Sequence, residues 1–242
     1  MDIFFEIIVM IILIAIQSIF GVGLLIFGTP SFLLFGYDFA NTINILMPIS
    51  ITISSLQFFK SKVSDKKFLG EYNLFCLPFL IIFLTIALNF KYLFDFKLLV
   101  GVLLIFSSVL ILNKRRFSSF KKTFFRFKKL VLIGIGCIHG LTNMGGSFLA
   151  IYSTLVSQNV KEVARYYICY GYLIMGVIQY LLVLMISFNH LVFEKLYYIL
   201  LAIIIYFPTQ KIFITINDKK FSKYINVIAL IYGLIIILSY FN

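Results

Sequence analysis

The chain has 242 residues, of which 62% are hydrophobic and 12% are charged, and its mean hydropathy is +1.07. Soluble domains are about 45–50% apolar and about 25% charged. The composition therefore excludes a soluble globular domain, a disordered regulator, a disulfide scaffold and a collagen-like chain. It predicts an all-α integral membrane protein that crosses the bilayer several times, because each crossing takes roughly 20 apolar residues.

Apolar stretches follow one another along the chain. Each is longer than a strand and lacks the two-residue alternation of a sheet, so we expect about seven or eight helical membrane segments. Asp38 stands just before the second stretch and is the expected N-cap of that helix. The stretches cover residues 4–30, 39–59, 72–89, 98–112, 130–157, 161–188, 193–209 and 225–241.

The net charge of +12 is interpreted through the loops, because Lys and Arg accumulate on the cytoplasmic side of a membrane. If every stretch crosses, the 21 Lys and Arg residues divide 13 to 8 between the two sides. If residues 130–157 enter and leave on the same side, the division is 18 to 3. We therefore expect 130–157 to be re-entrant, the basic loops to be cytoplasmic and the C-terminus to lie outside. Residues 1–37 contain no Lys or Arg, so the count leaves open whether the stretch 4–30 spans or is re-entrant.

A basic linker, residues 113–129, separates two halves of similar layout, residues 1–112 and 130–242, within one membrane domain. Its eight Lys and Arg residues are interleaved with phenylalanines. The pattern is typical of a cytoplasmic topology anchor, and it would also suit an anionic lipid surface. We expect the topology anchor, and we expect the lipid bilayer but no nucleic acid among the partners of the protein.

Each half opens with a long apolar stretch that glycines interrupt near its middle. The first interruption lies within Gln17–Pro30 and the second within His139–Tyr152. The polar-edged helix that follows each of them carries a glutamine. An offset of 122 residues pairs Gly21 with Asn143, Gly23 with Gly145 and Gln57 with Gln179.

Glycines in the middle of a membrane helix let it unwind, and the main-chain N–H groups that become free need protein or water as partners. The half-helix that follows presents free donors and a positive dipole end, which suit an anion. Two such breaks at corresponding positions of inverted halves indicate a transporter site near the midplane. Alternatively, the glycines only let helices pack closely, and the glutamines only bond helix to helix. The candidate substrate-binding residues are Gly21, Gly23, Gln57, Thr142, Asn143, Gly145, Gly146, Ser147 and Gln179.

At these residues the sequence resembles the TauE/SafE family, also called the sulfite exporter or sulfonate-uptake permease family. Members carry two glycine-rich motifs, each followed by a proline. Here the first copy spans Ser18–Leu25 with Pro30 downstream, and the second spans Gly140–Ser147. This sequence departs from the family pattern at Ser18, Leu24, Asn143 and Tyr152.

The resemblance implies a carrier of small sulfur-containing anions, such as sulfite, sulfonates or sulfoacetate, in a bacterial plasma membrane. It also implies coupling to an ion gradient. No metal and no organic cofactor is expected, and the sequence leaves open whether the protein forms a homo-oligomer. Two alternatives are a non-transporting accessory membrane protein and a passive small-anion channel.

Few ionisable groups lie in the apolar stretches. His139 is the candidate proton carrier, the alternative being a neutral imidazole bonded to a carbonyl that the break frees. Arg165 either pairs with Glu162 on the surface or guides an anion from the cytoplasm. The three cysteines lie in apolar stretches and are expected to pack as small apolar groups. No catalytic motif or ionisable cluster of a membrane enzyme is present, so we expect no enzymatic activity.

Overall fold

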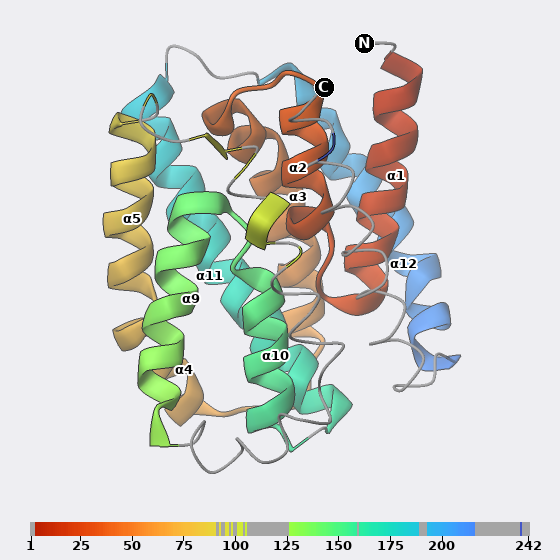
Figure 1. Cartoon of the computed structure of the whole chain (residues 1–242). Helices are drawn as coiled ribbons and strands as arrows, with labels where there is room; N and C mark the ends of the chain where they lie inside the picture. Colours follow the sequence, from red (N-terminus) through yellow and green to blue (C-terminus); the bar gives the residue numbers. More distant parts are fainter. Residues whose placement is uncertain are drawn as a thin grey trace.

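The computed structural model describes residues 3–90, 126–158, 160–188 and 193–215, with isolated positions between 92 and 105 and residue 238. Within these ranges the chain is helical and has no strand. The long helices lie side by side in one bundle (Figure 1). The elements are α1 (Ile3–Phe20), α2 (Leu24–Leu34), α3 (Phe39–Phe59), α4 (Lys66–Phe75), α5 (Leu77–Asn89), α9 (Lys128–Thr142), α10 (Gly146–Val156), α11 (Lys161–Ser187), the short 3-10 helix η4 (Glu194–Tyr197) and α12 (Tyr198–Thr215).

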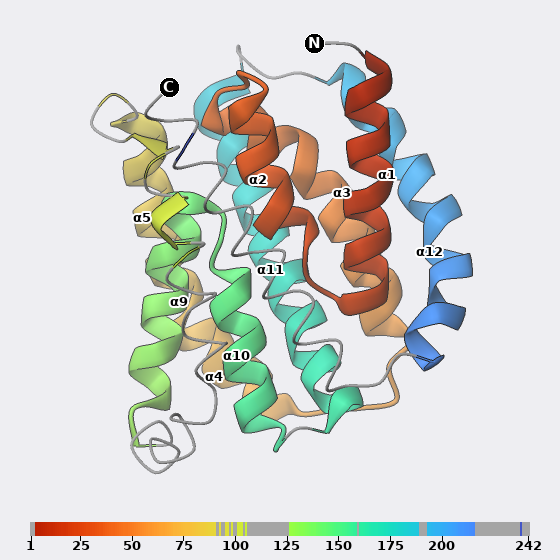
Figure 2. The same cartoon turned by 45° about the vertical axis from the view of Figure 1, so that its right-hand side comes forward.

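Two of the apolar stretches fold into helical hairpins (Figures 1 and 2). Helix α1 starts at the end of the bundle drawn uppermost in Figure 1, and α2 returns toward that upper end after a break at residues 21–23. Helix α9 starts at the opposite, lower end, and α10 returns to it after a break at residues 143–145. The interruptions that the glycines predict are therefore present, and the two hairpins enter the bundle from opposite ends.

Corresponding helices of the two halves have matching bounds. Helices α2 and α10 both contain 11 residues, and their first residues, Leu24 and Gly146, are 122 positions apart. Helices α3 and α11 begin at Phe39 and Lys161, which are again 122 positions apart. The contacts between helices match in the same way. Helix α1 packs against α12, and α9, the counterpart of α1 in the second half, packs against α5, the counterpart of α12 in the first half.

Helices α3 and α11 pack against each other in the centre of the bundle. A Cβ atom on Gly176 of α11 would lie 2.9 Å from Ile51 of α3, so the glycine permits this close approach. Asp38 caps α3 by accepting a hydrogen bond of 2.7 Å from the N–H of Asn41, which confirms the expected N-cap.

Two glycines set the contact between α5 and α9. A Cβ atom on Gly136 would collide with the carbonyl oxygen of Cys76, and one on Gly140 would lie 2.6 Å from that of Leu80. These glycines are four residues apart, so they lie on one face of α9 and let two backbones meet. Gly140 belongs to the second glycine-rich motif, and its place here is structural.

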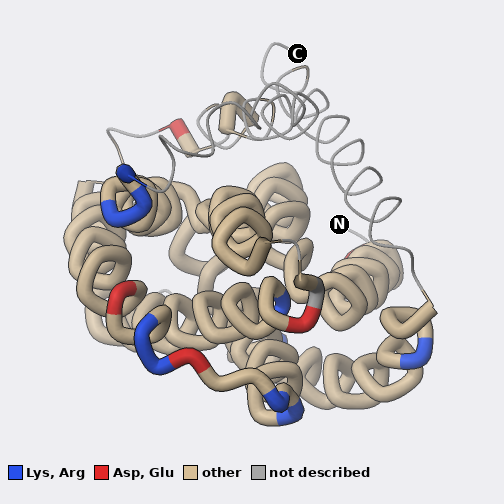
Figure 3. The backbone as a smooth tube through the Cα atoms, turned by 90° about the horizontal axis from the view of Figure 1, so that it is seen from below, with Lys and Arg blue, Asp and Glu red and all other residues tan. Residues whose placement is uncertain are grey.

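Basic residues gather at one end of the bundle (Figure 3). Of the eleven described Lys and Arg residues, ten lie in loops and helix ends at the lower end, and Lys195 lies at the upper end. Residues 130–157, which form most of the α9–α10 hairpin, enter and leave at the lower end.

Five helical stretches among the described residues are long and apolar enough to cross a membrane: α1, α3, α4 continued by α5, α11, and η4 continued by α12. Helices α2 and α10 are shorter apolar helices. The stretch 4–30 is thus one long and one short helix, and only its first part has spanning length. The predicted segments 98–112 and 225–241 and the linker 113–129 lie almost entirely outside the described residues. The count of seven or eight segments and the division into two repeated halves stay predictions.

Candidate functional site

The first break joins α1 to α2 through two glycines with positive φ angles. Gly21 has φ +75° and Gly23 has φ +130°, conformations that side chains other than glycine rarely adopt. A Cβ atom on Gly23 would also collide with the side chain of Ile16. Residues 21–30 are all buried, and none of the side chains that the structure describes caps the first turn of α2. The sequence thus places an uncapped helix N-terminus inside the protein.

Three side chains donate hydrogen bonds to the carbonyl oxygen of Ser18. The end of α1 leaves this oxygen without its helical N–H partner. Gln57 Nε2 donates to it over 2.9 Å, Gln210 Nε2 over 3.0 Å and an Arg165 guanidinium nitrogen over 3.4 Å. The carbonyl oxygen of Gln17 accepts a further hydrogen bond of 3.1 Å from Gln57. These contacts tie the tip of the first hairpin to α3, α11 and α12.

Arg165 brings a positive charge to this tip. Its guanidinium donates to Gln210 Oε1 over 2.7 Å and lies 3.9 Å from the ring centroid of Phe213, whereas its Nε has no hydrogen-bond partner among the described residues. A Cβ atom on Gly21 would lie 3.8 Å from Arg165 Cγ. The guanidinium of Arg165 therefore forms its hydrogen bonds at the break. It does not form the surface ion pair with Glu162 that the sequence allowed.

The second break joins α9 to α10 at Asn143, which has the left-handed φ of +62°. Its main-chain N–H donates to the carbonyl oxygen of His139 over 2.8 Å, and its side-chain Nδ2 donates to Thr29 Oγ1 over 3.0 Å. Asparagine tolerates this conformation better than most residues, which explains how it stands where the family pattern has glycine. Its Oδ1 is buried and lacks a partner in the described part of the chain.

Four buried polar side chains surround this second break, and each has at least one atom without a hydrogen bond to a described residue. Gln179 Nε2 lies 3.4 Å from the carbonyl oxygen of His139, but its Oε1 is unpaired. Neither imidazole nitrogen of His139 has a hydrogen-bond partner among the described residues, and the ring centroid lies 6.4 Å from that of Tyr172. The four side chains are those of His139, Asn143, Tyr172 and Gln179.

The hydroxyl of Tyr172 points at the first residue of α10. It lies so close that a Cβ atom on Gly146 would collide with it. No described side chain caps α10, and its first residue, Gly146, lies beside this hydroxyl, whereas the N–H of Ser147 donates to the carbonyl oxygen of Met144 over 3.4 Å. Because buried polar groups are normally paired, this combination makes the start of α10 the candidate position for a ligand that accepts hydrogen bonds.

The remaining predicted residues hold the break together. Thr142 Oγ1 donates to the carbonyl oxygen of Ile138 over 2.6 Å and accepts from the N–H of Met144 over 3.2 Å. Ser147 Oγ donates to the carbonyl oxygen of Met144 over 3.2 Å. A Cβ atom on Gly145 would lie 2.5 Å from the Cβ of His139, so glycine is needed there for packing.

The two breaks contact different levels of α11. Gly21 faces Arg165 and Cys169, whereas Gly146 faces Tyr172. Seven residues separate Arg165 from Tyr172, which is about 10 Å along a helix. The bond from Asn143 to Thr29 links the tip of the second hairpin to α2 of the first.

Sequence reasoning did not select Tyr172, Thr29 or Gln210 as site residues. A signal existed for Tyr172, because it lies seven residues before Gln179 and therefore on the same face of the helix. No comparable signal pointed to Gln210, which reaches the site only through packing of α12 against α1. Within the described ranges, no three His, Cys, Asp or Glu side chains converge as metal ligands would.

The family model described as Sulfite exporter TauE/SafE matches residues 6–236. The chain belongs to the TauE/SafE family. No curated protein and no solved structure matches it. The TauE/SafE match and the five long apolar helices establish a multi-pass membrane protein of a transporter family, and the match includes both hairpins.

Proposed function

We propose that this TauE/SafE protein is a secondary transporter that carries a small sulfur oxyanion, such as sulfite or a sulfonate, across the plasma membrane. The observation that carries the proposal is the second break. There the N-terminus of α10 lies beside the hydroxyl of Tyr172, both of them buried, and neither a cap for the helix nor a partner for the hydroxyl is found among the described side chains. Main-chain N–H groups and a phenol hydroxyl are donors, so they suit an oxyanion better than a cation.

The first break supplies a second set of donors. Arg165 lies at this break, where its side chain approaches Gly21 and its guanidinium donates to the carbonyl oxygen of Ser18, and a guanidinium suits oxyanions. An anion that moves between the two breaks would stay within reach of donors over the whole step. This supports a carrier whose two halves, inverted relative to each other, alternately open the site to either end of the bundle.

Several observations support the inverted repeat on which this mechanism rests. Helices α2 and α10 are equal in length and 122 residues apart, and the two hairpins enter from opposite ends. Gln57 and Gln179, also 122 residues apart, each donate to a main-chain carbonyl where a helix breaks. The lower end, with ten of the eleven described Lys and Arg residues, would face the cytoplasm and the C-terminus the outside.

His139 is our candidate for proton coupling. Its imidazole is buried next to the second break, and neither nitrogen has a hydrogen-bond partner among the described residues. A proton gained there would add a positive charge beside the bound anion, which links proton movement to substrate movement. The test is the replacement His139→Gln, which we expect to leave flux that no longer responds to a proton gradient.

The central experiment measures uptake of radiolabelled sulfite and of a small sulfonate by proteoliposomes, with and without a proton gradient. We expect Asn143→Leu and Gly146→Leu to abolish flux while the protein still inserts. The matched control is Gly134→Ala in α9, where a Cβ atom has open space and flux should be unchanged.

Two results would contradict the proposal. Inserted wild-type protein that moves no sulfur anion would favour the accessory-protein alternative. Flux that rises in proportion to concentration without saturating, and that ignores the gradient, would favour the passive channel.

A further inference from the structure

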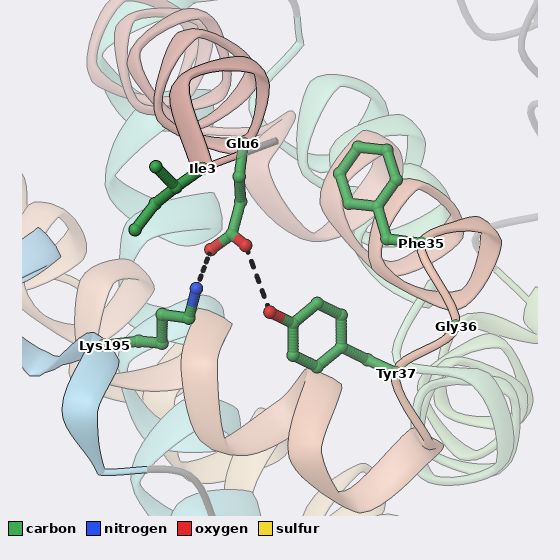
Figure 4. Close-up of a pocket in the computed structure, with 6 residues that line it drawn as sticks. All are labelled: Ile3, Glu6, Phe35, Gly36, Tyr37 and Lys195. Carbon is green, nitrogen blue, oxygen red and sulfur yellow. Dashed lines mark hydrogen bonds and ion pairs between the residues drawn. The ribbon is translucent and has the colours of Figure 1, made fainter. Parts of the chain in front are cut away.

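A polar cavity lies at the upper end of the bundle, beside the first turns of α1 (Figure 4). It has a volume of about 280 Å³. Ile3, 56% exposed, places it next to the surface of the protein. The cavity is lined by Ile3, Glu6, Phe35, Gly36, Tyr37 and Lys195.

Three donors converge on one carboxylate beside this cavity. Lys195 Nζ donates to Glu6 Oε1 over 2.6 Å, and the hydroxyl of Tyr198 donates to the same oxygen over 3.0 Å. The hydroxyl of Tyr37 donates to Glu6 Oε2 over 3.0 Å. An ammonium group and two phenol hydroxyls around two oxygens of a monoanion are the donor set that a small oxyanion needs.

Few charged side chains lie at the upper end of the bundle among the described residues. Lys195 is the single described Lys or Arg at the upper end, and its side chain is 15% exposed. The side chain of Glu6 is 4% exposed. A pair that served only to anchor α1 to η4 would need no cavity beside it, whereas here the cavity reaches both charged groups.

We propose that Lys195, Tyr37 and Tyr198 form an upper oxyanion site for a small anion such as sulfite, and that Glu6 occupies this site when no anion is bound. The choice of ligand class rests on the proposed function. The anion enters the cavity, takes over the three hydrogen bonds, and the Glu6 side chain turns out toward water. Glu6 therefore competes with the anion, which keeps the resting affinity of the site low.

The exchange has a structural consequence for the first break. Glu6 lies on α1, and the same helix ends at Gly21. When Glu6 leaves the donors, α1 loses the bonds that tie its first turns to η4, to α12 and to the connection between α2 and α3. An anion at the upper site thereby loosens the attachment of α1, the first helix of the first hairpin.

The test measures sulfite binding by calorimetry on purified, detergent-solubilised protein. The substitution Asn143→Leu serves as background to remove the site at the second break. In that background we expect Glu6→Gln to tighten sulfite binding by about tenfold or more, because a neutral carboxamide competes less well for an ammonium group. Adding Lys195→Gln should abolish the gain. Glu71→Gln is the matched control, since Glu71 forms the ion pair with Lys128 at the lower end and should leave binding unchanged.

Glu6→Ala provides a second variant that empties the site completely and should also tighten binding. Unchanged affinity in both Glu6 variants, or a gain that survives Lys195→Gln, would overturn the upper site. Flux is measured separately in proteoliposomes. Binding at the upper site without flux would refute the proposed transport and not this site, and flux without such binding would do the reverse.

Discussion

Gln57 donates a hydrogen bond of 3.1 Å to the main-chain carbonyl oxygen of Gln17, close to the point where α1 ends. The second half shows the same relationship, because Gln179 donates to the carbonyl oxygen of His139 over 3.4 Å. Each of these carbonyl oxygens also accepts a main-chain hydrogen bond, from Gly21 over 2.7 Å and from Asn143 over 2.8 Å. In both halves a glutamine of the following long helix thus adds a second hydrogen bond to the last turn before the break.

This relationship predicts unequal effects of two identical substitutions. Gln57 donates hydrogen bonds to two carbonyl oxygens, those of Gln17 and Ser18, whereas Gln179 donates to one carbonyl oxygen at a longer distance. We expect Gln57→Leu to lower the free energy of unfolding by about 1–3 kcal/mol, and Gln179→Leu to lower it by less. Thermal unfolding of both variants in the same detergent checks this. Equal losses would contradict the assigned hydrogen bonds.

Tyr172→Phe separates stability from binding. The hydroxyl of Tyr172 is buried and unpaired in the described part of the chain, and an unpaired buried group is costly. Removing it should raise the free energy of unfolding by about 1 kcal/mol and weaken sulfite binding severalfold. Unfolding and calorimetry on the same preparation measure the two effects. A variant that is less stable and binds normally would assign the hydroxyl a structural role.

A third prediction concerns packing of α5 against α9. Gly136→Ala places a methyl group against the carbonyl oxygen of Cys76 and should destabilise the protein by about 1–3 kcal/mol. Gly134→Ala, on the same helix but facing open space, should stabilise it by up to about 1 kcal/mol, because alanine favours helix. Thermal unfolding of the two variants side by side gives the comparison. Equal and small shifts would show that the two helices can separate without cost.

Stability should also depend on pH through Asp65 in the loop after α3. The hydroxyl of Tyr167 donates to its carboxylate over 2.6 Å, and the N–H of Phe68 donates over 3.0 Å. These bonds lower the pKa of Asp65 below its ordinary value of 3.8. A lowered carboxyl pKa adds stability that is present above the ordinary pKa and is lost as the pH falls through the folded value.

Tyr167→Phe removes the larger of these causes, so the pKa of Asp65 should move back toward 3.8. The variant should lose some stability near neutral pH, and its further loss below about pH 4 should be smaller than in the wild type. Unfolding measured from pH 3 to pH 7 tests the difference. Identical pH profiles would show that the hydroxyl does not act on this carboxylate.

Much of the fold could be predicted from the sequence, because its signals are local. Glycines with unusual backbone angles mark the breaks at Gly21 and Gly23, and Asp38 marks the start of α3. Apolar stretches of sufficient length indicated the helices. The turn at Asn143 was harder, since only the offset of 122 residues aligned it with a glycine.

The site was less accessible to sequence reasoning, because its partners come together through packing. Tyr172 meets Gly146, and Asn143 meets Thr29 across 114 residues. The cluster at Glu6 joins residues up to 192 positions apart. Such pairings depend on how α1, α11 and α12 lie in the bundle, and no local pattern encodes that arrangement.

The short length of α2 and α10 has an electrical consequence. Eleven residues of helix extend about 16 Å, roughly half of the ~30 Å hydrocarbon core of a bilayer. A monovalent anion held at the tip of either hairpin therefore lies part of the way through the membrane potential. Moving one charge across the whole potential changes its free energy by about 2.3 kcal/mol per 100 mV. The free energy of binding an anion at each tip should therefore change by about half that amount per 100 mV. The resting potential of the cell thus alters the fraction of protein molecules that hold an anion.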